Sequence, residues 1–382
     1  MHAARLLPHV LCLIGTACSN NPDGNLHIVV PDLDKRAVGE TTLIIGPDGR
    51  IVLLDTANDR HAAEVRALVR QHTGATRVDD LIVTSYSAAH VGGVDDLLSP
   101  ASEDMLDVRR VITRGPFDLD EDADVGEYRD ICEPVEASGV DRLDLCSSDD
   151  APACEGNAGP VRASGCPGLT LGDLDDSGDD LGEDEAGAAS FLDLGEGARL
   201  NFVHADGYTA AGPLGAVASS EADTPGLVEG GRSLVVSVTW GEFSYLRGGD
   251  IGGNPADGPD VESALAVEGL VPAVDILQLN RHGSTEASND TWLDAVLAGE
   301  QTKDAIVSGA AAFEGYPAAD VVARVATHLN GGAIWATSTE NGFEGDGVTL
   351  CSQADQTQDL TVIVAPGGSY SIACVDRQDD GR

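Results

Sequence analysis

The sequence predicts a mixed α/β fold in one exported domain. Short apolar runs bounded by turn residues indicate strands, apolar residues at helical spacing indicate helices between some of them, and one long acidic segment interrupts the series. With 382 residues, of which 42% are apolar, the chain can bury a large core. Its mean hydropathy of −0.07 excludes a polytopic membrane protein.

The predicted strands and helices lie on both sides of the acidic segment. Before it, the turn Pro47-Asp48-Gly49 separates two strands, and apolar spacing predicts a helix over 60–72. After it, Val321, Val322, Val325 and Leu329 share one face of a predicted helix over 318–329. The predicted strands are 41–45, 51–54, 81–83, 199–203, 233–240, 275–279, 305–308 and 333–337, with a final hairpin of 360–364 and 370–374.

Residues 116–196 form the acidic segment. They are rich in Asp, Glu, Gly and Ser, hold four cysteines and show few apolar runs, which predicts a disulfide-stapled insertion rather than a core element. Within it, Asp173, Asp175 and Ser177 match the first half of a calcium loop. Position 12 of that loop is Asp184 instead of glutamate, and no helices are predicted beside it. A flexible acidic loop is therefore the favoured alternative.

The N-terminus predicts export. A short apolar run ends in Gly15-Thr16-Ala17-Cys18, too short for a mature membrane span, and residues 1–18 are expected to be a signal peptide. The cysteine after Thr16-Ala17 resembles the lipobox of bacterial lipoproteins, which implies lipidation of Cys18 and a location in the cell envelope. Because such boxes usually carry leucine where Gly15 stands, ordinary cleavage and secretion remain the alternative. Residues 19–25 are predicted to tether the domain 26–382.

Six cysteines remain after the signal peptide, an even number that predicts disulfides in an exported chain. None forms a Cys-x-x-Cys pair, so a zinc knuckle is not expected. Cys351 and Cys374 end two neighbouring strand-type runs and are the preferred pair. The other four would staple the insertion: Cys132, Cys146, Cys154 and Cys166.

The charge balance is extreme, with 65 acidic residues against 22 basic ones and a formal net charge of −43. Such a chain repels nucleic acid and anionic lipid, so nucleic acid is disfavoured as a partner and membrane contact is expected only through a lipid anchor. A solvated acidic surface suited to a salty or calcium-rich medium is the simpler interpretation. The more specific interpretation is that the protein binds divalent cations or a cationic partner. The sequence leaves the partner and the oligomeric state unknown.

Five stretches, taken together, resemble the metallo-β-lactamase superfamily, and most closely the soluble domain of the DNA-uptake protein ComEC. The resemblance covers most of residues 26–350 outside the insertion, and it implies a four-layer αβ/βα sandwich with a metal site along one edge. The stretches are Gly39 to Ala57, Asp80 to Gly93, Gly248 to Ile251, Asp275 to Ser284, and Gly315-Tyr316-Pro317 with Thr337 and Asn341-Gly342.

The resemblance implies a degenerate metal site. The family's motif His-x-His-x-Asp-His falls on Ser85, Ser87, Ala89 and His90, so three ligands of that motif are lost. A serine hydroxyl stays protonated near neutral pH and is a poor zinc ligand. The family's bridging aspartate falls on Asp250 and its last histidine on His282. These two residues and His90 would hold at most one ion, zinc or else iron or manganese.

The remaining family positions are assigned less directly. His204 and Tyr208 both fit the place of a further histidine ligand, and the resemblance implies that Asp55 orients the metal-motif loop. A structural alternative stands beside the metal site: His90 as a packed histidine and Asp250 with His282 as a hydrogen-bonded pair. Two function hypotheses follow, a non-catalytic envelope protein that uses the sandwich for binding or as a scaffold, and a mononuclear phosphodiesterase or nuclease. The −43 charge weakens the nuclease version.

Overall fold

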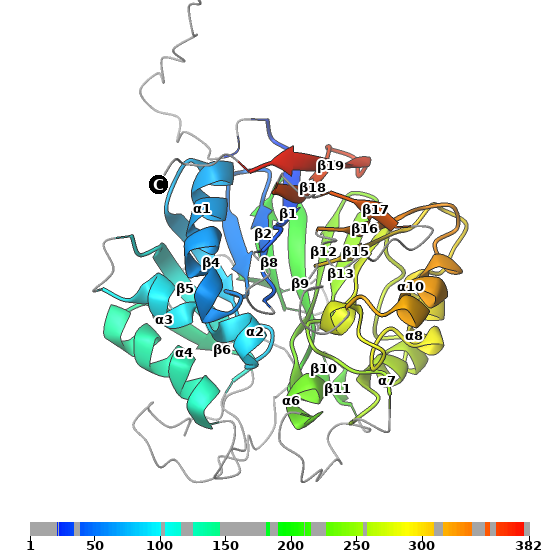
Figure 1. Ribbon diagram of the computed structural model, residues 1–382, viewed down its shortest axis with the longest axis horizontal. Coiled ribbons are helices and arrows are strands. Elements are labelled where there is room, and N and C mark those ends of the chain that lie inside the picture. Colours follow the sequence, from blue (N-terminus) through cyan, green and yellow to red (C-terminus); the bar gives the residue numbers. More distant parts are fainter. Residues whose placement is uncertain are drawn as a thin grey trace, which may run out of the picture.

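Two mixed β-sheets face each other, and helices cover the outer face of each (Figure 1). This arrangement comes from a computed structural model. The residues it describes are 21, 23–33, 39–100, 104–115, 125–145, 181–183, 190–209, 211–214, 227–254, 258–308, 316–337, 348–351 and 357–377.

The first sheet has the strand order β19-β18-β1-β2-β3-β4-β5-β6. Its β19-to-β3 half is antiparallel, whereas β3, β4, β5 and β6 run parallel. The strands are β1 (Leu26–Val30), β2 (Thr42–Ile45), β3 (Ile51–Leu54), β4 (Arg77–Ile82), β5 (Asp107–Thr113), β6 (Asp141–Asp144), β18 (Gln358–Val364) and β19 (Tyr370–Asp376).

The second sheet follows the order β11-β10-β9-β12-β13-β14-β15-β16-β17, and β8 and β7 continue it from β9. From β13 to β17 the strands are parallel. The strands are β7 (Leu181–Glu183), β8 (Ser190–Gly195), β9 (Ala198–Ala205), β10 (Tyr208–Thr209), β11 (Gly212–Pro213), β12 (Val235–Trp240), β13 (Phe243–Arg247), β14 (Ile276–Gln278), β15 (Asp304–Val307), β16 (Ile334–Ala336) and β17 (Val348–Leu350).

The helices divide between the two outer layers. Helices α1, α3 and α4 pack on the first sheet, and α7, α8 and α10 pack on the second (Figure 1). Their bounds, with those of the shorter helices, are η1 (Asp59–His61), α1 (Ala62–Thr73), α2 (Ala88–Val91), α3 (Val94–Leu98), α4 (Val125–Ser138), α6 (Leu227–Arg232), α7 (Val261–Val267), η2 (Asn280–Gly283), α8 (Asp290–Val296) and α10 (Ala319–Ala326).

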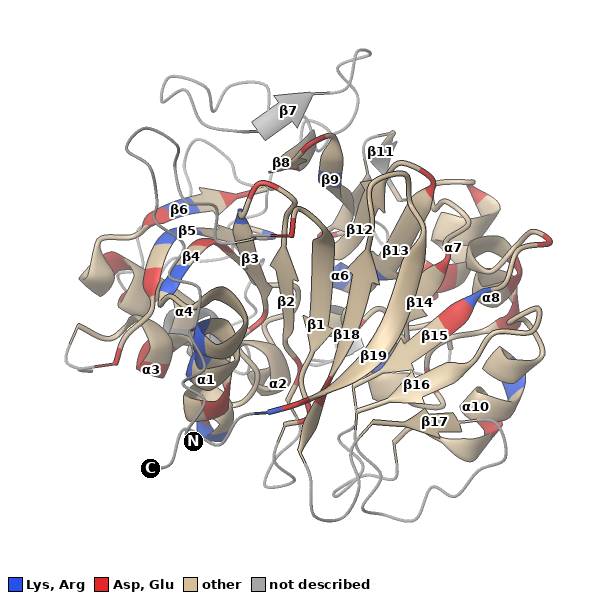
Figure 2. Ribbon diagram, turned by 90° about the horizontal axis from the view of Figure 1, so that it is seen from above, with Lys and Arg blue, Asp and Glu red and all other residues tan. Residues whose placement is uncertain are grey.

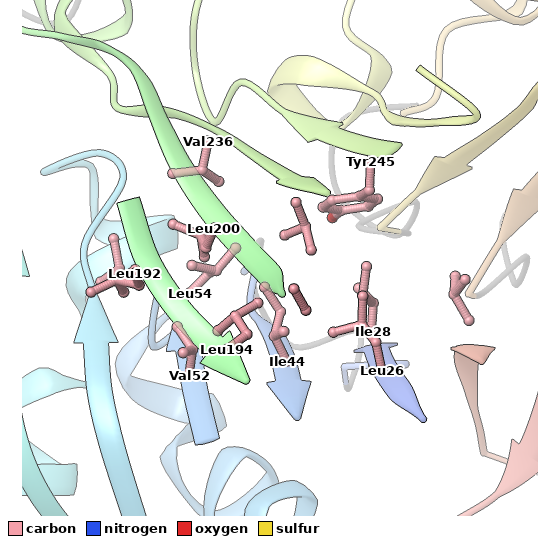
Figure 3. Close-up of a cluster of buried hydrophobic side chains, with 14 of the residues drawn as sticks. Leu26, Ile28, Ile44, Val52, Leu54, Leu192, Leu194, Leu200, Val236 and Tyr245 are labelled. Carbon is pink, nitrogen blue, oxygen red and sulfur yellow. The ribbon is translucent and has the colours of Figure 1, made fainter. Parts of the chain in front are cut away.

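Alternation along the strands explains the layers, because successive side chains of a strand point to opposite faces of its sheet. In β2, Ile44 enters the cluster between the sheets, while Leu43 and Ile45 enter the cluster under the helices. The result is three buried apolar clusters, one between each pair of neighbouring layers. Figure 3 shows the central one, in which Leu26, Ile28, Ile44, Val52 and Leu54 meet Leu192, Leu194, Leu200, Val236 and Tyr245.

Charged residues concentrate at the periphery of this arrangement. In Figure 2 many acidic residues lie on the helices and at strand ends, whereas β4, β5 and β6 at one edge of the first sheet carry both acidic and basic residues. The exposed acids of α3, Asp95 and Asp96, alternate with buried Val94 and Leu97, so the helix keeps one apolar face toward the sheet. Among the described helices, none has the length and apolar character needed to cross a membrane.

The predicted sandwich is confirmed, and each predicted strand and helix corresponds to an observed one within a few residues. The prediction that residues 116–196 contribute no core element is wrong. Helix α4 and strands β6 and β8 lie in this range, and Ile131, Leu143 and Leu192 are buried in the clusters. Composition concealed them because short elements between acidic stretches carry too few apolar residues to stand out.

Several predicted features fall wholly or partly outside the described residues. These are the signal peptide with Cys18, the calcium loop at Asp173, Asp175 and Ser177, and Cys146, Cys154 and Cys166. Cys132 is disulfide-bonded, and its bond partner lies outside the described residues. Of the predicted tether, Asn21 is 5% exposed and its side-chain amide donates to the carbonyl of Gly46 at 2.8 Å, so the chain is bound to the domain from there.

The predicted disulfide between Cys351 and Cys374 is confirmed. Cys351 directly follows β17 of the second sheet, and Cys374 lies in β19 of the first sheet. The bond therefore joins the two sheets covalently. Cys351 belongs to the central cluster, and Cys374 packs against it.

Replacing both cysteines by serine should lower the free energy of unfolding by about 3 kcal/mol, because the crosslink closes a loop with a sequence separation of 23 residues. Urea denaturation of the Cys351→Ser/Cys374→Ser protein beside the oxidised wild type measures this difference. An unchanged midpoint would show that the link adds nothing to the apolar contacts between the sheets.

Candidate metal centre

The residues that carry potential chemistry meet at one edge of the sandwich. Asp55 follows β3, His90 follows β4, Asp250 follows β13, and His282 follows β14. Strands β3 and β4 run parallel in one sheet, and β13 and β14 run parallel in the other. Carboxyl ends of parallel strands lie at the same edge of a sheet, a usual position for ligand sites. The fold thereby brings together side chains that are up to 227 positions apart, from Asp55 to His282.

Asp55 organises the loop after β4, the role expected for it from the sequence. One of its oxygens, Oδ1, accepts a hydrogen bond from the main-chain N–H of Thr84 at 2.6 Å, and Oδ2 accepts one from the Thr84 hydroxyl at 2.6 Å. The guanidinium of Arg247 also donates to Oδ2. Asp55 is fully buried and has a φ of 62°, a strained conformation for a residue other than glycine. These bonds together stabilise that conformation.

His90 lies between two carboxylates. Its Nδ1 is 2.7 Å from Oδ2 of Asp55, and its Nε2 is 3.1 Å from Oδ1 of Asp250. The side chain is completely buried in helix α2. Metal-binding histidines usually donate one ring N–H to a carboxylate or carbonyl and bind the ion through the other nitrogen. His90 is therefore held at both ends of its ring.

Asp250 also contacts two serines of the loop after β4, Ser85 and Ser87. The hydroxyls of Ser85 and Ser87 donate to its Oδ2 at 3.0 and 2.9 Å. Gly249 precedes it with a φ of 57°, and a Cβ there would lie 3.0 Å from the hydroxyl oxygen of Thr84. Two hydroxyl donors thus bind one oxygen of the Asp250 carboxylate.

His282 directs Nε2 into the buried cluster. Its Nδ1 is 3.2 Å from the Ser308 hydroxyl, and this hydroxyl donates its one proton to Oε1 of Glu40 at 3.1 Å. Nδ1–H must therefore be the donor to Ser308, which leaves Nε2 as the nitrogen that could bind a metal ion. Nε2 is buried and has no hydrogen-bond partner. Arg281 and His282 have φ values of 49° and 55°, a second strained point at the site.

Glu40 completes the group. It lies just before β2, is 1% exposed, and its Oε1 also accepts from the side-chain amide of Gln278. Its other oxygen, Oε2, lies 3.8 Å from Nε2 of His90 and has no hydrogen-bond partner. One donor atom each from Glu40, His90 and His282 lie within 4.8 Å of one another.

The electrostatics of the cluster reflect burial and close opposite charges. Burial alone would raise the pKa of Asp55, but the charges of Arg247 and His90 outweigh it and lower that pKa. Burial would likewise raise the pKa of Glu40, and Arg247, His282 and His90 lower it. Burial would also raise the pKa of Asp250, but the charge and hydrogen bond of His90 outweigh it and lower that pKa. Burial opposes the imidazolium form of His90, yet Asp250 and Asp55 hold its pKa well above the usual value.

The donor set fits one divalent metal ion. Two buried donor atoms without partners, Oε2 of Glu40 and Nε2 of His282, lie near Nε2 of His90, and an ion between them would satisfy both. Charge agrees with this. If a bound ion replaced the proton of His90, both histidines would be neutral, and the carboxylates of Glu40, Asp55 and Asp250 with the guanidinium of Arg247 would leave two negative charges. Arg281, which also acts on Asp250, is paired with Glu286. One divalent cation would balance the two negative charges.

Other sequence-predicted residues have different roles. His204 is buried, and both of its ring nitrogens bind main chain: Nδ1 donates to the carbonyl of Ser233 at 2.9 Å, and Nε2 accepts from the N–H of Gly207 at 3.2 Å. It is therefore a core histidine. Ala89 contributes its carbonyl, which accepts from the N–H of Glu40 at 2.9 Å. The alternative pair of Asp250 with His282 does not occur among the described contacts, because Asp250 pairs with His90 instead.

Sequence reasoning missed Glu40 and Arg247. Glu40 lies inside the stretch that carried the resemblance but was not considered as a ligand. Arg247 ends an otherwise apolar strand, Phe243–Arg247, and is 1% exposed. A charged residue within a buried-type strand requires a partner, and that signal predicts a buried ion pair.

Comparisons with known proteins add little to this picture. No family model matches the chain, and no curated protein matches it. Among solved structures, the crystal structure of a new diphosphatase from the PhnP family matches over 91% of this chain and 97% of that chain, with 12% identity and a TM-score of 0.35. A TM-score this low carries no argument, so the fold assignment rests on the two sheets and their helix layers.

The core role of His204 predicts a specific pH dependence. Burial lowers its pKa from 6.5 to about 4, so the unfolded chain binds a proton there at a pH where the folded chain does not. Stability from this residue is present above pH 6.5 and is lost as the pH falls toward 4, by up to about 3 kcal/mol. Thermal unfolding of wild type and His204→Gln across pH 4–8 should show a steeper acid loss in the wild type. Parallel curves would contradict a neutral core histidine.

Proposed function

We propose that this protein binds one divalent transition-metal ion, preferentially zinc, at Glu40, His90, His282 and Asp250. The observation that carries the proposal is the pair of buried, partnerless donor atoms, Oε2 of Glu40 and Nε2 of His282, beside Nε2 of His90. Asp250 lies outside the three donors that are within 4.8 Å of one another, and we include it as the fourth ligand because its Oδ1 is 3.1 Å from Nε2 of His90. Two histidines and two carboxylates suit zinc, and also iron or manganese.

We further propose that the ion is structural and that the protein is a non-catalytic binding or scaffold protein. Four protein ligands fill a tetrahedral zinc site, whereas a catalytic zinc keeps a position for water or substrate. Glu40, His90 and His282 are at most 5% exposed, which supports a closed centre. Bound there, a metal ion would supply charge neutralisation and crosslink loops of both sheets, while Arg247 neutralises Asp55 and Ser85 and Ser87 hold Asp250.

Export to the cell envelope is part of this proposal. The disulfide between Cys351 and Cys374 supports an oxidising compartment, where such bonds persist. Lipidation of Cys18 would anchor the protein, and a formal net charge of −43 opposes electrostatic attraction to an anionic membrane.

A mononuclear hydrolase is the second candidate, and one observation favours it. The side chain of Asp250 is 16% exposed, so one member of the cluster faces solvent. If Asp250 left the ion, water could take its place, as in catalytic sites with three protein ligands.

Metal analysis of the purified protein should give one zinc, iron or manganese ion per chain at this site. His90→Ala and His282→Ala should each abolish binding, and Glu40→Gln should weaken it, because each removes or neutralises a ligand. His204→Gln is the matched control, a buried histidine outside the cluster, and it should keep the ion. Plasma emission spectroscopy after dialysis and a chelator competition measure content and affinity.

The outcomes separate the candidates. Two tightly bound transition-metal ions would overturn the single-ion site, and no ion in wild type would leave only a buried ion-pair cluster. Metal-dependent hydrolysis of bis-p-nitrophenyl phosphate that is lost in His90→Ala would favour the hydrolase over the structural role.

A further inference from the structure

Glu262 is a buried carboxylate outside the metal cluster that contacts neither the ion-binding donors nor solvent. It lies in the first turn of α7 and is fully buried. Burial raises its pKa to about 7 although three N–H groups donate to it. Burying a carboxylate costs free energy, and an apolar side chain at such a position often gives equal stability. The hydrogen bonds of Glu262 therefore indicate which other role it has.

All three donors come from the segment that follows β14. Oε1 of Glu262 accepts from the side-chain amide of Asn280 at 2.7 Å and from the main-chain N–H of Ser288 at 2.7 Å. Oε2 accepts from the main-chain N–H of Asn289 at 2.9 Å. Asn280 begins η2, the turn that carries His282. Glu262 therefore fixes both ends of the loop that presents this histidine.

The same residue is connected to the loop that carries Asp250. The main-chain N–H of Glu262 donates to the carbonyl of Gly252 at 3.2 Å. Asn280, which Glu262 orients, accepts from the N–H of Gly248 through its Oδ1 at 3.1 Å. Gly253 lies so close that a Cβ there would be 2.1 Å from Oε2 of Glu262. Glu262 thus contacts both loops, 280–289 through its carboxylate and 248–253 through its main-chain N–H and its packing against Gly253. The loops also bond to each other directly, for example from the N–H of Gly253 to the carbonyl of Glu286 at 2.8 Å.

We propose that Glu262 is a positioning residue that sets the distance and orientation between Asp250 and His282, and thereby the affinity for the metal ion. This inference rests on the proposed metal site. Hydrogen-bond partners behind the ligands orient them, and their loss usually weakens metal binding by about 10–100-fold. Glu262 does not contact a proposed ligand directly. It hydrogen-bonds to Asn280 and Gly252, which lie in the loops that carry His282 and Asp250.

The test compares Glu262→Gln with wild type and with Asp359→Asn. Gln keeps the size of the side chain but offers a single acceptor oxygen, so the bond from Asn289 is lost and an N–H group faces another donor. Asp359 is a matched control, a fully buried aspartate in the first sheet whose partners include Arg377 and His72. In chelator competition with zinc, Glu262→Gln should bind about 10–100-fold more weakly, and Asp359→Asn should match wild type even if it is less stable.

A second measurement does not depend on the metal. Hydrogen exchange of the metal-free protein should be faster in Glu262→Gln over both 248–253 and 280–289, and unchanged there in Asp359→Asn. Asn280→Ala, which cuts the connection to Gly248 while leaving α7 intact, should show the same two effects and serves if Glu262→Gln does not fold.

Wild-type zinc affinity together with wild-type exchange in the variants would overturn the positioning role. If wild type itself binds no ion, the proposed metal site fails. Faster exchange in both loops would then still show that Glu262 couples them, and unchanged exchange would refute that coupling as well.

Discussion

Buried negative charge at one edge of the sandwich is the constraint that organises this molecule. Glu40, Asp55 and Asp250 carry carboxylates into a region where burial raises the energy of each charge. Arg247 neutralises part of it, and His90 lies between two of the three acids. The remaining partnerless donors make a cation the natural complement. Ser85 and Ser87 donate to Asp250 at this edge, and their hydroxyls are poor ligands for zinc.

The packing of the surrounding fold keeps these charged groups buried and close together. Apolar clusters on both faces of each sheet fix the strands, and the strands fix the loops at their carboxyl ends. Strained residues occur in the segments that follow the strands, Asp55 after β3 and His282 in η2. Such strain persists only where many contacts oppose relaxation. The disulfide between Cys351 and Cys374 adds a covalent link between the same two sheets.

The sequence predicted the layers well because they follow from local periodicity: apolar alternation in strands such as 41–45 and helical spacing at 318–329. It also predicted that His90, Asp250 and His282 converge, because the resemblance supplied their long-range proximity. Glu40 and Arg247 could not be recognised as site residues, since only tertiary structure places them beside His90. The elements within 116–196 were missed because acidic flanks dominate their composition.

Anomalous diffraction at the zinc absorption edge, from crystals of the zinc-loaded protein, tests the central claim most directly. The account predicts one anomalous peak per chain, about 2.0–2.2 Å from Nε2 of His90, Nε2 of His282 and carboxylate oxygens of Glu40 and Asp250. Two peaks in the cluster, or one peak that does not involve Glu40 and His282, would contradict it.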